Sequence, residues 1–110
     1  MSEELTLNEY QGFAETTAVF PEYYAEEYLM LGLASEVGEM LGKLAKYYRK
    51  DGDGGYPDDA LIDELGDVLW FVAMLATFLE QDLSEVARKN ITKLQDRKAR
   101  GVIKGSGDNR

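Results

Sequence analysis

Two long segments carry apolar residues at helical spacing, and this periodicity constrains the fold more than any other feature of the sequence. Residues 22–50 place apolar side chains three or four positions apart, at Leu29, Leu33, Val37, Met40, Leu41 and Leu44. Residues 57–81 do the same at Leu61, Leu65, Val68, Phe71, Val72, Leu75 and Phe78. Alternating runs of strand length are absent from the sequence, so we expect an all-α fold. The short loop "DGDGGYP" between the segments predicts that they pack antiparallel as two long central helices.

A shorter helix is expected before this pair. Thr6 suits an N-cap and Glu9 lies three residues later, which is the spacing of a capping box. We expect this first helix to run to about Val19, because Pro21 follows and disfavours helical backbone in the residue before it.

A fourth helix is expected after the pair. Asp82 and Glu85 again have capping-box spacing, and the helix should extend to about Arg100. The four helices form a bundle in one domain, residues 1–100, since a chain of 110 residues with 45% hydrophobic residues can build one core. We expect residues 101–110 to form a flexible, glycine-rich tail, which either closes over a site or has no fixed order.

Glycines inside the two long helices need a reason, because each costs about 1 kcal/mol of helix propensity. They are Gly32, Gly38, Gly42 and Gly66. Close approach of the two helix backbones is one explanation, and chance is the other.

The charge balance excludes several classes of protein. The formal net charge is −9, which disfavours nucleic-acid binding through a basic face. No run reaches the roughly 18 apolar residues of a membrane span, and the acidic N-terminus does not resemble a signal peptide, so we expect a cytoplasmic protein. Histidine and cysteine are both absent, so acid–base chemistry falls to carboxylates, lysine or tyrosine, and thiolate metal sites are excluded. The lack of histidine also argues against a ferritin-like di-iron site, which uses Glu-x-x-His motifs.

Each long helix carries a pair of acidic residues beside its apolar stripe. Glu36 and Glu39 stand three apart in "SEVGEM", and Glu64 and Asp67 stand three apart in "DELGDV". Residues at this spacing point from one helix face, so antiparallel packing can bring the pairs opposite each other. Carboxylates in such a groove repel, and Mg²⁺ or Mn²⁺ would offset the repulsion. A solvated polar edge of the bundle is the alternative, but two pairs on the core side favour the metal site.

The expected fourth helix adds a row of donors. Asn90, Lys93 and Arg97 lie on one helix face and suit the oxygens of a polyphosphate. By itself such a row is more typical of surface salt bridges, and its position beside a metal site is what favours phosphate.

These motifs together resemble the MazG-like nucleotide pyrophosphohydrolases of the all-α NTP pyrophosphatase superfamily. The family pattern is Glu-x-x-Glu, a variable gap, then Glu-x-x-Asp, and this chain matches it at Glu36, Glu39, Glu64 and Asp67. The segment "NITKLQDR" is similar to the family's Asn-x-x-Lys-x-x-x-Arg element, and "YQGFAETTA" is similar to the first helix of small members.

The resemblance implies a Mg²⁺-dependent enzyme, with Mn²⁺ as a substitute, that cleaves a (d)NTP to the monophosphate and pyrophosphate. It implies that the four carboxylates bind the metal and that Glu36, Glu39 or a metal-held water provides the attacking hydroxide. It further implies phosphate or sugar contacts from Asn90, Lys93 and Arg97. A homodimer or homotetramer and a role in nucleotide-pool house-cleaning are expected as well. A non-enzymatic helical interaction module with a solvated acidic face is the alternative.

Residues that select the base are harder to predict. The candidates are Tyr10, Gln11, Tyr47, Tyr48 and Trp70, each of which fits the core or an interface better than a base contact. Lys43 lies four residues after Glu39, where it either pairs with that glutamate or reaches a phosphate.

Overall fold

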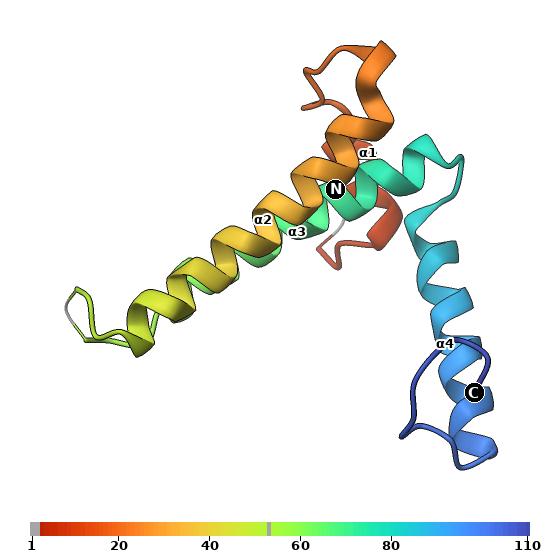
Figure 1. The fold of residues 1–110 in the computed structure, drawn as a ribbon. Helices are drawn as coiled ribbons and strands as arrows, with labels where there is room; N and C mark the ends of the chain where they lie inside the picture. Colours follow the sequence, from red (N-terminus) through yellow and green to blue (C-terminus); the bar gives the residue numbers. More distant parts are fainter. Residues whose placement is uncertain (1–2, 53) are drawn as a thin grey trace.

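The chain folds into four α-helices and one short 3₁₀ helix, with no strand among residues 3–52 and 54–110, which this computed structural model describes. The elements are α1 (Leu7–Glu15), η1 (Glu22–Tyr24), α2 (Ala25–Tyr48), α3 (Asp58–Phe78) and α4 (Leu83–Ala99). The prediction of an all-α fold is therefore confirmed. Helices α2 and α3 lie side by side and antiparallel, as predicted, while α4 points away from them (Figure 1).

The core lies where α3 packs against α1 and against the first half of α2. Its buried apolar side chains are Ala14, Leu29, Phe71, Ala73, Met74, Ala76 and Leu83. Gly32 on α2 faces Phe71 on α3, and a Cβ atom at Gly32 would lie 2.2 Å from Phe71 Cε1. Close approach therefore explains Gly32, whereas Gly38, Gly42 and Gly66 have nothing within 4 Å of an added Cβ.

The two predicted capping boxes have different outcomes. Thr6 and Glu9 form theirs: the Thr6 hydroxyl accepts from the Glu9 N–H, and the Glu9 carboxylate accepts from the Thr6 N–H. Asp82 is the N-cap residue of α4 but makes no side-chain cap, so the box predicted there is wrong. Glu85 pairs instead with Arg88 one turn later.

Side chains of α1 cap α4 in place of Asp82. The Leu83 N–H donates to Gln11 Oε1 at 2.7 Å, and the Ser84 N–H donates to Asn8 Oδ1 at 3.0 Å. These two bonds satisfy donors that a helix start otherwise leaves open.

Two predicted helix ends also differ from the structure. Helix α1 ends at Glu15 rather than near Val19, because the hydroxyls of Thr16 and Thr17 bond to the carbonyls of the preceding turn. Helix α3 ends at Phe78 rather than near Gln81, because Glu80 adopts a left-handed conformation with φ 59°. The Gln81 N–H then donates back to the Ala76 carbonyl, which closes a Schellman motif.

Residues 101–110 fold back beside α4 without forming a helix (Figure 1). The Arg110 side chain fixes this turn by donating to the carbonyls of Val102, Ile103 and Gly107.

The chain leaves much of its apolar surface open. Its radius of gyration is 17.1 Å, whereas a compact domain of this length has about 13 Å. Large apolar side chains on the hairpin are more than one-third exposed, including Met30, Leu31, Leu41, Ile62, Leu65 and Leu69. None of the described helices is both long and apolar enough to span a membrane.

Candidate metal centre

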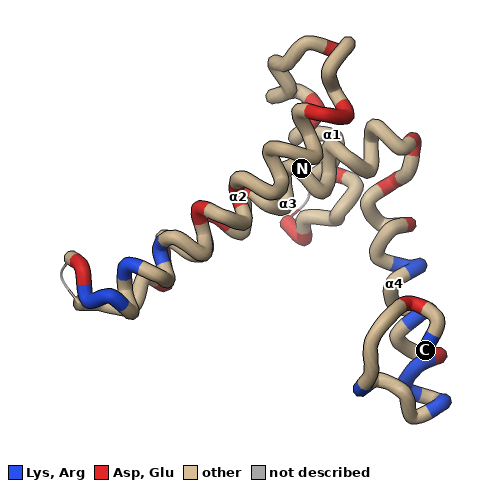
Figure 2. The backbone as a smooth tube through the Cα atoms, in the orientation of Figure 1, with Lys and Arg blue, Asp and Glu red and all other residues tan. Residues whose placement is uncertain are grey.

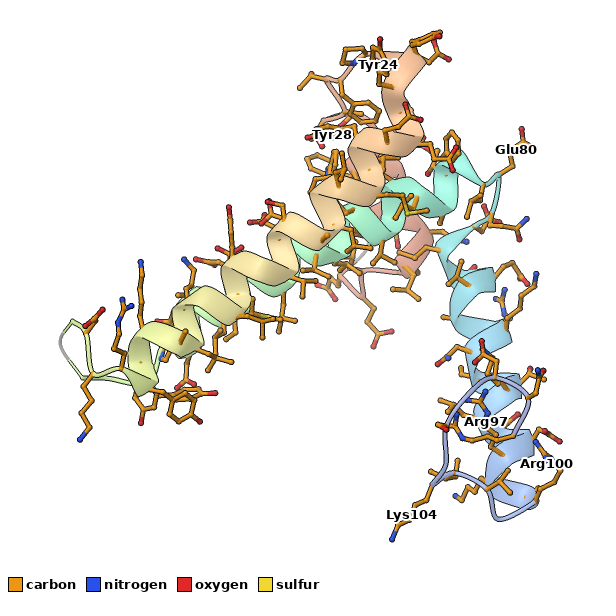
Figure 3. The ribbon with its side chains drawn as sticks, in the orientation of Figure 1. Tyr24, Tyr28, Glu80, Arg97, Arg100 and Lys104 are labelled. Carbon is orange, nitrogen blue, oxygen red and sulfur yellow. The ribbon has the colours of Figure 1, made fainter. Side chains whose placement is uncertain are left out.

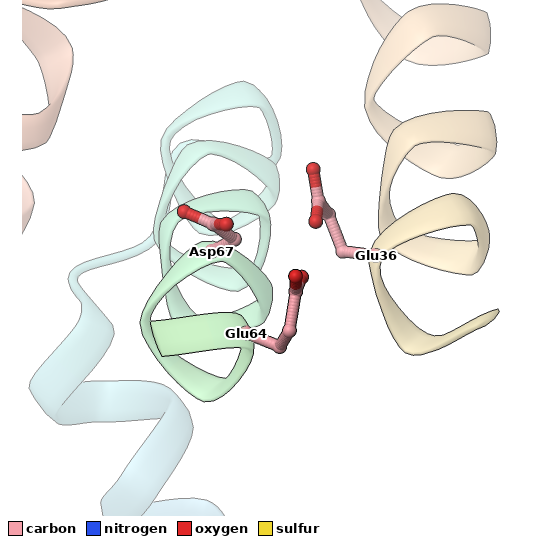
Figure 4. A group of neighbouring side chains, drawn as sticks. All are labelled: Glu36, Glu64 and Asp67. Carbon is pink, nitrogen blue, oxygen red and sulfur yellow. The ribbon is translucent and has the colours of Figure 1, made fainter. Parts of the chain in front are cut away.

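Three of the four predicted carboxylates converge between α2 and α3. Glu36 projects from α2 toward Glu64 and Asp67 on α3 (Figure 4). One oxygen of each carboxylate lies within 4.8 Å of the others, which is a separation that a single bound cation can bridge. The spacing of the acidic pairs and the antiparallel hairpin together produce this cluster.

Two oxygens of the cluster are buried without a hydrogen-bond donor among the described residues. They are Glu36 Oε2 and Glu64 Oε2, and the Glu64 residue as a whole is only 7% exposed. Burying an ionised carboxylate oxygen without a partner is costly, so the arrangement is suited to a positive ligand. Asp67 is exposed at the open side of the cluster, which leaves an entry path.

The electrostatics of Glu36 reflect this crowding. Burial is the largest cause that raises the pKa of Glu36 from its ordinary value of 4.5 to about 7. A hydrogen bond that its protonated form makes with Glu64 raises the pKa too, because two ionised carboxylates have no proton to share. The negative charges of Glu39 and Asp67 act in the same direction.

Glu39 does not belong to the group of three converging oxygens. It lies one turn after Glu36 on α2, is exposed, and is close enough to raise the pKa of Glu36. Its carboxylate therefore borders the cluster on the solvent side.

A lysine meets the cluster from α2. Lys43 Nζ lies 3.3 Å from Glu64 Oε1, so Lys43 pairs with Glu64. Of the two alternatives that the spacing offered, the pair with Glu39 does not form, and the phosphate contact stays a prediction. Among the described residues, no other basic side chain forms an ion pair with the four predicted carboxylates.

The predicted phosphate-binding row lies elsewhere. Asn90, Lys93 and Arg97 are on α4, where several Lys and Arg residues fall along the chain, and α4 runs away from the hairpin (Figure 2). The row therefore does not meet the carboxylates within one chain.

A carboxylate of the tail occupies part of that row. Asp108 Oδ1 lies 3.1 Å from Arg97 Nη2 and 3.3 Å from Lys93 Nζ. Arg97 is 6% exposed and lies between α4 and the returning tail (Figure 3). Both cations hold the pKa of Asp108 below its usual value, with the bond to Arg97 the largest cause. No sequence pattern pointed to this contact, because the tail has no periodicity.

The candidate base-contacting residues separate into different roles. Gln11 is buried, and its side-chain amide forms hydrogen bonds with Thr77, Gln81 and Leu83, so its role is structural. Trp70 Nε1 donates to the Thr17 hydroxyl at 2.7 Å while its ring packs against the core.

The candidate tyrosines lie at two different distances from the cluster. Tyr10 is half-buried against the core, and burial followed by the charge of Asp67 raises the pKa of its hydroxyl. Tyr10 is therefore beside the carboxylate cluster. Tyr47 and Tyr48 lie at the far end of the hairpin, where they line a pocket of about 380 Å³.

Fold and site together define a helical-hairpin protein with a cluster of three carboxylates that could hold a metal ion. Comparison with known proteins assigns the family: residues 24–102 match the model of the MazG nucleotide pyrophosphohydrolase domain, so the chain belongs to that family. The chain is also similar to "Gene 37 protein" of Mycobacterium phage L5, with 46% identity over 110 residues, covering 92% of this chain and 96% of that protein. No solved structure gave a significant match.

Proposed function

We propose that this protein hydrolyses nucleoside triphosphates, ribo or deoxy, to the monophosphate and pyrophosphate. Membership of the MazG nucleotide pyrophosphohydrolase family supports the reaction class. The observation that carries the proposal is the pair of buried, donor-free oxygens on Glu36 and Glu64, which face Asp67 across the hairpin.

The donor set fits Mg²⁺, or Mn²⁺ in its place. Both are hard cations that prefer carboxylate oxygen, and the described site offers neither thiolate nor imidazole. We assign Glu36, Glu64 and Asp67 as direct ligands, and Glu39 as the fourth carboxylate at the solvent side. A cation bound there would neutralise phosphate charge and acidify a neighbouring water near neutral pH.

Glu36 and Glu39 are the residues that we assign to proton transfer. Their carboxylates are neighbours on α2 beside the proposed cation, so either is placed to accept a proton from a water that the cation acidifies. Glu39 is exposed, so it can meet a water molecule that enters from solvent.

We further propose that a second copy of the chain completes the site, in a homodimer or homotetramer. Asn90, Lys93 and Arg97 would then bind the phosphate and sugar groups of a nucleotide held by the partner's carboxylates. The extended shape and the open apolar face of the hairpin support this assembly, since isolated domains rarely expose so much apolar surface.

Product analysis tests the reaction. Purified protein is incubated with Mg²⁺ and a panel of canonical and modified (d)NTPs, and pyrophosphate and phosphate are assayed separately, with EDTA as control. We expect equal amounts of monophosphate and pyrophosphate, only with metal. A preference for modified nucleotides would support house-cleaning of the nucleotide pool. Release of single phosphate, or no turnover on any nucleotide, would overturn the proposal.

Substitutions test the carboxylates. Glu64→Gln and Asp67→Asn should each lower turnover by about 100-fold or more while helical circular dichroism is retained. Asp63→Asn on the same helix is the matched control, because Asp63 is exposed and lies outside the cluster. Full activity in both site variants would rule out the assigned roles.

A mixing experiment tests the composite site. Glu64→Gln and Arg97→Ala are each expected to be inactive alone. If the two residues act in one site from different copies, mixed assemblies contain intact sites and activity returns on mixing. Failure to recover activity in assemblies shown to exchange subunits would place both residues in a site formed by one chain.

A further inference from the structure

The Lys43–Glu64 ion pair joins a partly exposed cation to a buried anion. Glu64 is 7% exposed, and one of its oxygens forms an ion pair with Lys43 while the other has no donor among the described residues. The Lys43 side chain is 38% exposed, so its ammonium can leave Glu64 without opening the core. Because Glu64 is buried, loss of the ammonium alone would leave its charge uncompensated, so Lys43 is expected to leave only when another cation takes its place.

Lys43 supplies positive charge to the carboxylate cluster when no metal ion is bound there. It lies seven residues after Glu36, two turns along the same face of α2, so it approaches the carboxylates from the helix that carries half of them. A divalent cation on the donor-free Oε2 of Glu64 would repel the Lys43 ammonium, which lies 3.3 Å from Oε1 of the same carboxylate, and so would weaken the ion pair.

The displaced ammonium has an open groove beside it. This groove, of about 240 Å³, lies toward the hairpin loop and is lined by Lys43 together with Lys46, Tyr47 and Ala60. Asp51 also lines the groove, but its carboxylate is paired with Arg49. Two lysines beside a cation-binding site form a local surface that favours polyphosphate oxygens.

We propose that Lys43 alternates between two anions: Glu64 when no cation is bound, and a phosphate group of the nucleotide when a cation holds Glu64. This inference rests on the proposed function, because it requires the carboxylates to bind a divalent cation. Lys43 is then a substrate-positioning residue in the hairpin, additional to the row on α4.

The proposal predicts that replacing Lys43 strengthens Mn²⁺ binding and weakens pyrophosphate binding in the same variant. Lys43→Met removes a competitor for Glu64, so the nucleotide-free protein should bind Mn²⁺ about threefold to tenfold more tightly. The same variant lacks the donor for phosphate, so it should bind inorganic pyrophosphate about tenfold more weakly at saturating Mg²⁺. Lys43→Arg keeps the charge and should restore both affinities toward those of the original protein.

The experiment is a calorimetric titration of Mn²⁺, and then of pyrophosphate, into the full chain and its variants. Lys46→Met is the control for the Mn²⁺ titration, because Lys46 lies one turn further along α2 and has no ion pair with the cluster among the described residues. Thermal melting reports folding, and Mn²⁺ should raise the Tm of Lys43→Met by more than it raises that of the original protein.

The outcomes are separable. An Mn²⁺ affinity that is unchanged or weaker in Lys43→Met, or altered equally in Lys46→Met, would overturn the alternation, as would unchanged pyrophosphate binding. In those cases hydrolysis by the original protein would still support the proposed function. If the original protein binds no Mn²⁺ at all, the proposed function and this inference are both wrong.

Discussion

The side chain of Gln11 on α1 accepts a hydrogen bond from the backbone N–H of Leu83 at 2.7 Å and so caps the first turn of α4. The same amide donates to the Thr77 hydroxyl at 3.0 Å and to the Gln81 carbonyl at 2.9 Å. One buried side chain thereby links α1 to the end of α3 and the start of α4, and it sets the direction in which α4 leaves the core.

Replacing Gln11 with methionine keeps the volume of the side chain and removes all three bonds. Because the Leu83 N–H and the Gln81 carbonyl lose their partner, we expect the free energy of unfolding to fall by about 3 kcal/mol. Urea denaturation measures this change. Asn8→Ala is the comparison, since Asn8 caps the neighbouring N–H from an exposed position and should cost about 1 kcal/mol. Equal losses in the two variants would contradict the role assigned to Gln11.

Gly32→Ala should destabilise the hairpin although alanine favours helix. The new methyl would meet the Phe71 ring at 2.2 Å, and the ring must shift within the core. We expect a loss of about 1–3 kcal/mol in thermal denaturation. Gly12→Ala on α1, with nothing within 4 Å of the added atom, should instead gain up to about 1 kcal/mol. A Gly32→Ala protein as stable as the original would show that the helices separate easily at this point.

The raised pKa of Glu36 predicts that stability depends on pH when no cation is present. The folded protein holds the Glu36 proton up to pH about 7, whereas the unfolded chain releases it near 4.5. The stabilising contribution of the protonated form is complete below the unfolded value and is lost as the pH rises through the folded value. We therefore expect the Tm, measured in EDTA, to decrease as the pH is raised from about 4.5 to about 7.

Added Mg²⁺ should remove much of this decline, because a cation offsets the repulsion that the proton relieves at low pH. Glu36→Gln is the control and should show a flatter profile in EDTA. A Tm that rises with pH over the same interval in the original protein would contradict the assignment.

Asp108→Asn should free the donor row on α4. The Asp108 carboxylate bridges Arg97 and Lys93, so its loss leaves both cations open to another anion. We expect pyrophosphate to bind α4 more tightly in this variant, and trypsin to cleave the released tail sooner after Lys104. Asp96→Asn makes the same charge change on α4 but breaks a pair with Arg100 instead. An equal effect of the two substitutions on pyrophosphate affinity would point to net charge alone.

The sequence predicted the features of the fold that depend on residues close together in the chain. The Thr6–Glu9 capping box needs only residues three apart, and it forms as predicted. The meeting of Glu36 with Glu64 and Asp67 follows from helical spacing and one short loop, so it was predictable before any coordinates. Whether these residues bind metal stays a prediction.

Contacts between distant segments were not predictable in the same way. The cap of α4 comes from Asn8 and Gln11, which no pattern near Asp82 reveals. The end of α3 depends on a left-handed Glu80, where the usual signal is glycine. The Asp108 contact with Arg97 depends on the path of an irregular tail.

The carboxylate cluster also bears on the order in which the chain folds. Helices α2 and α3 are consecutive, so Glu36, Glu64 and Asp67 meet as soon as their loop closes. Pairings of such low contact order form faster than those that join α1 to α4. Repulsion among the carboxylates therefore arises in the nascent hairpin, before the hydrogen bonds of Gln11 join α1 to α3 and α4. Lys43 belongs to the same hairpin, so its positive charge can offset the repulsion among these carboxylates as soon as α2 and α3 meet.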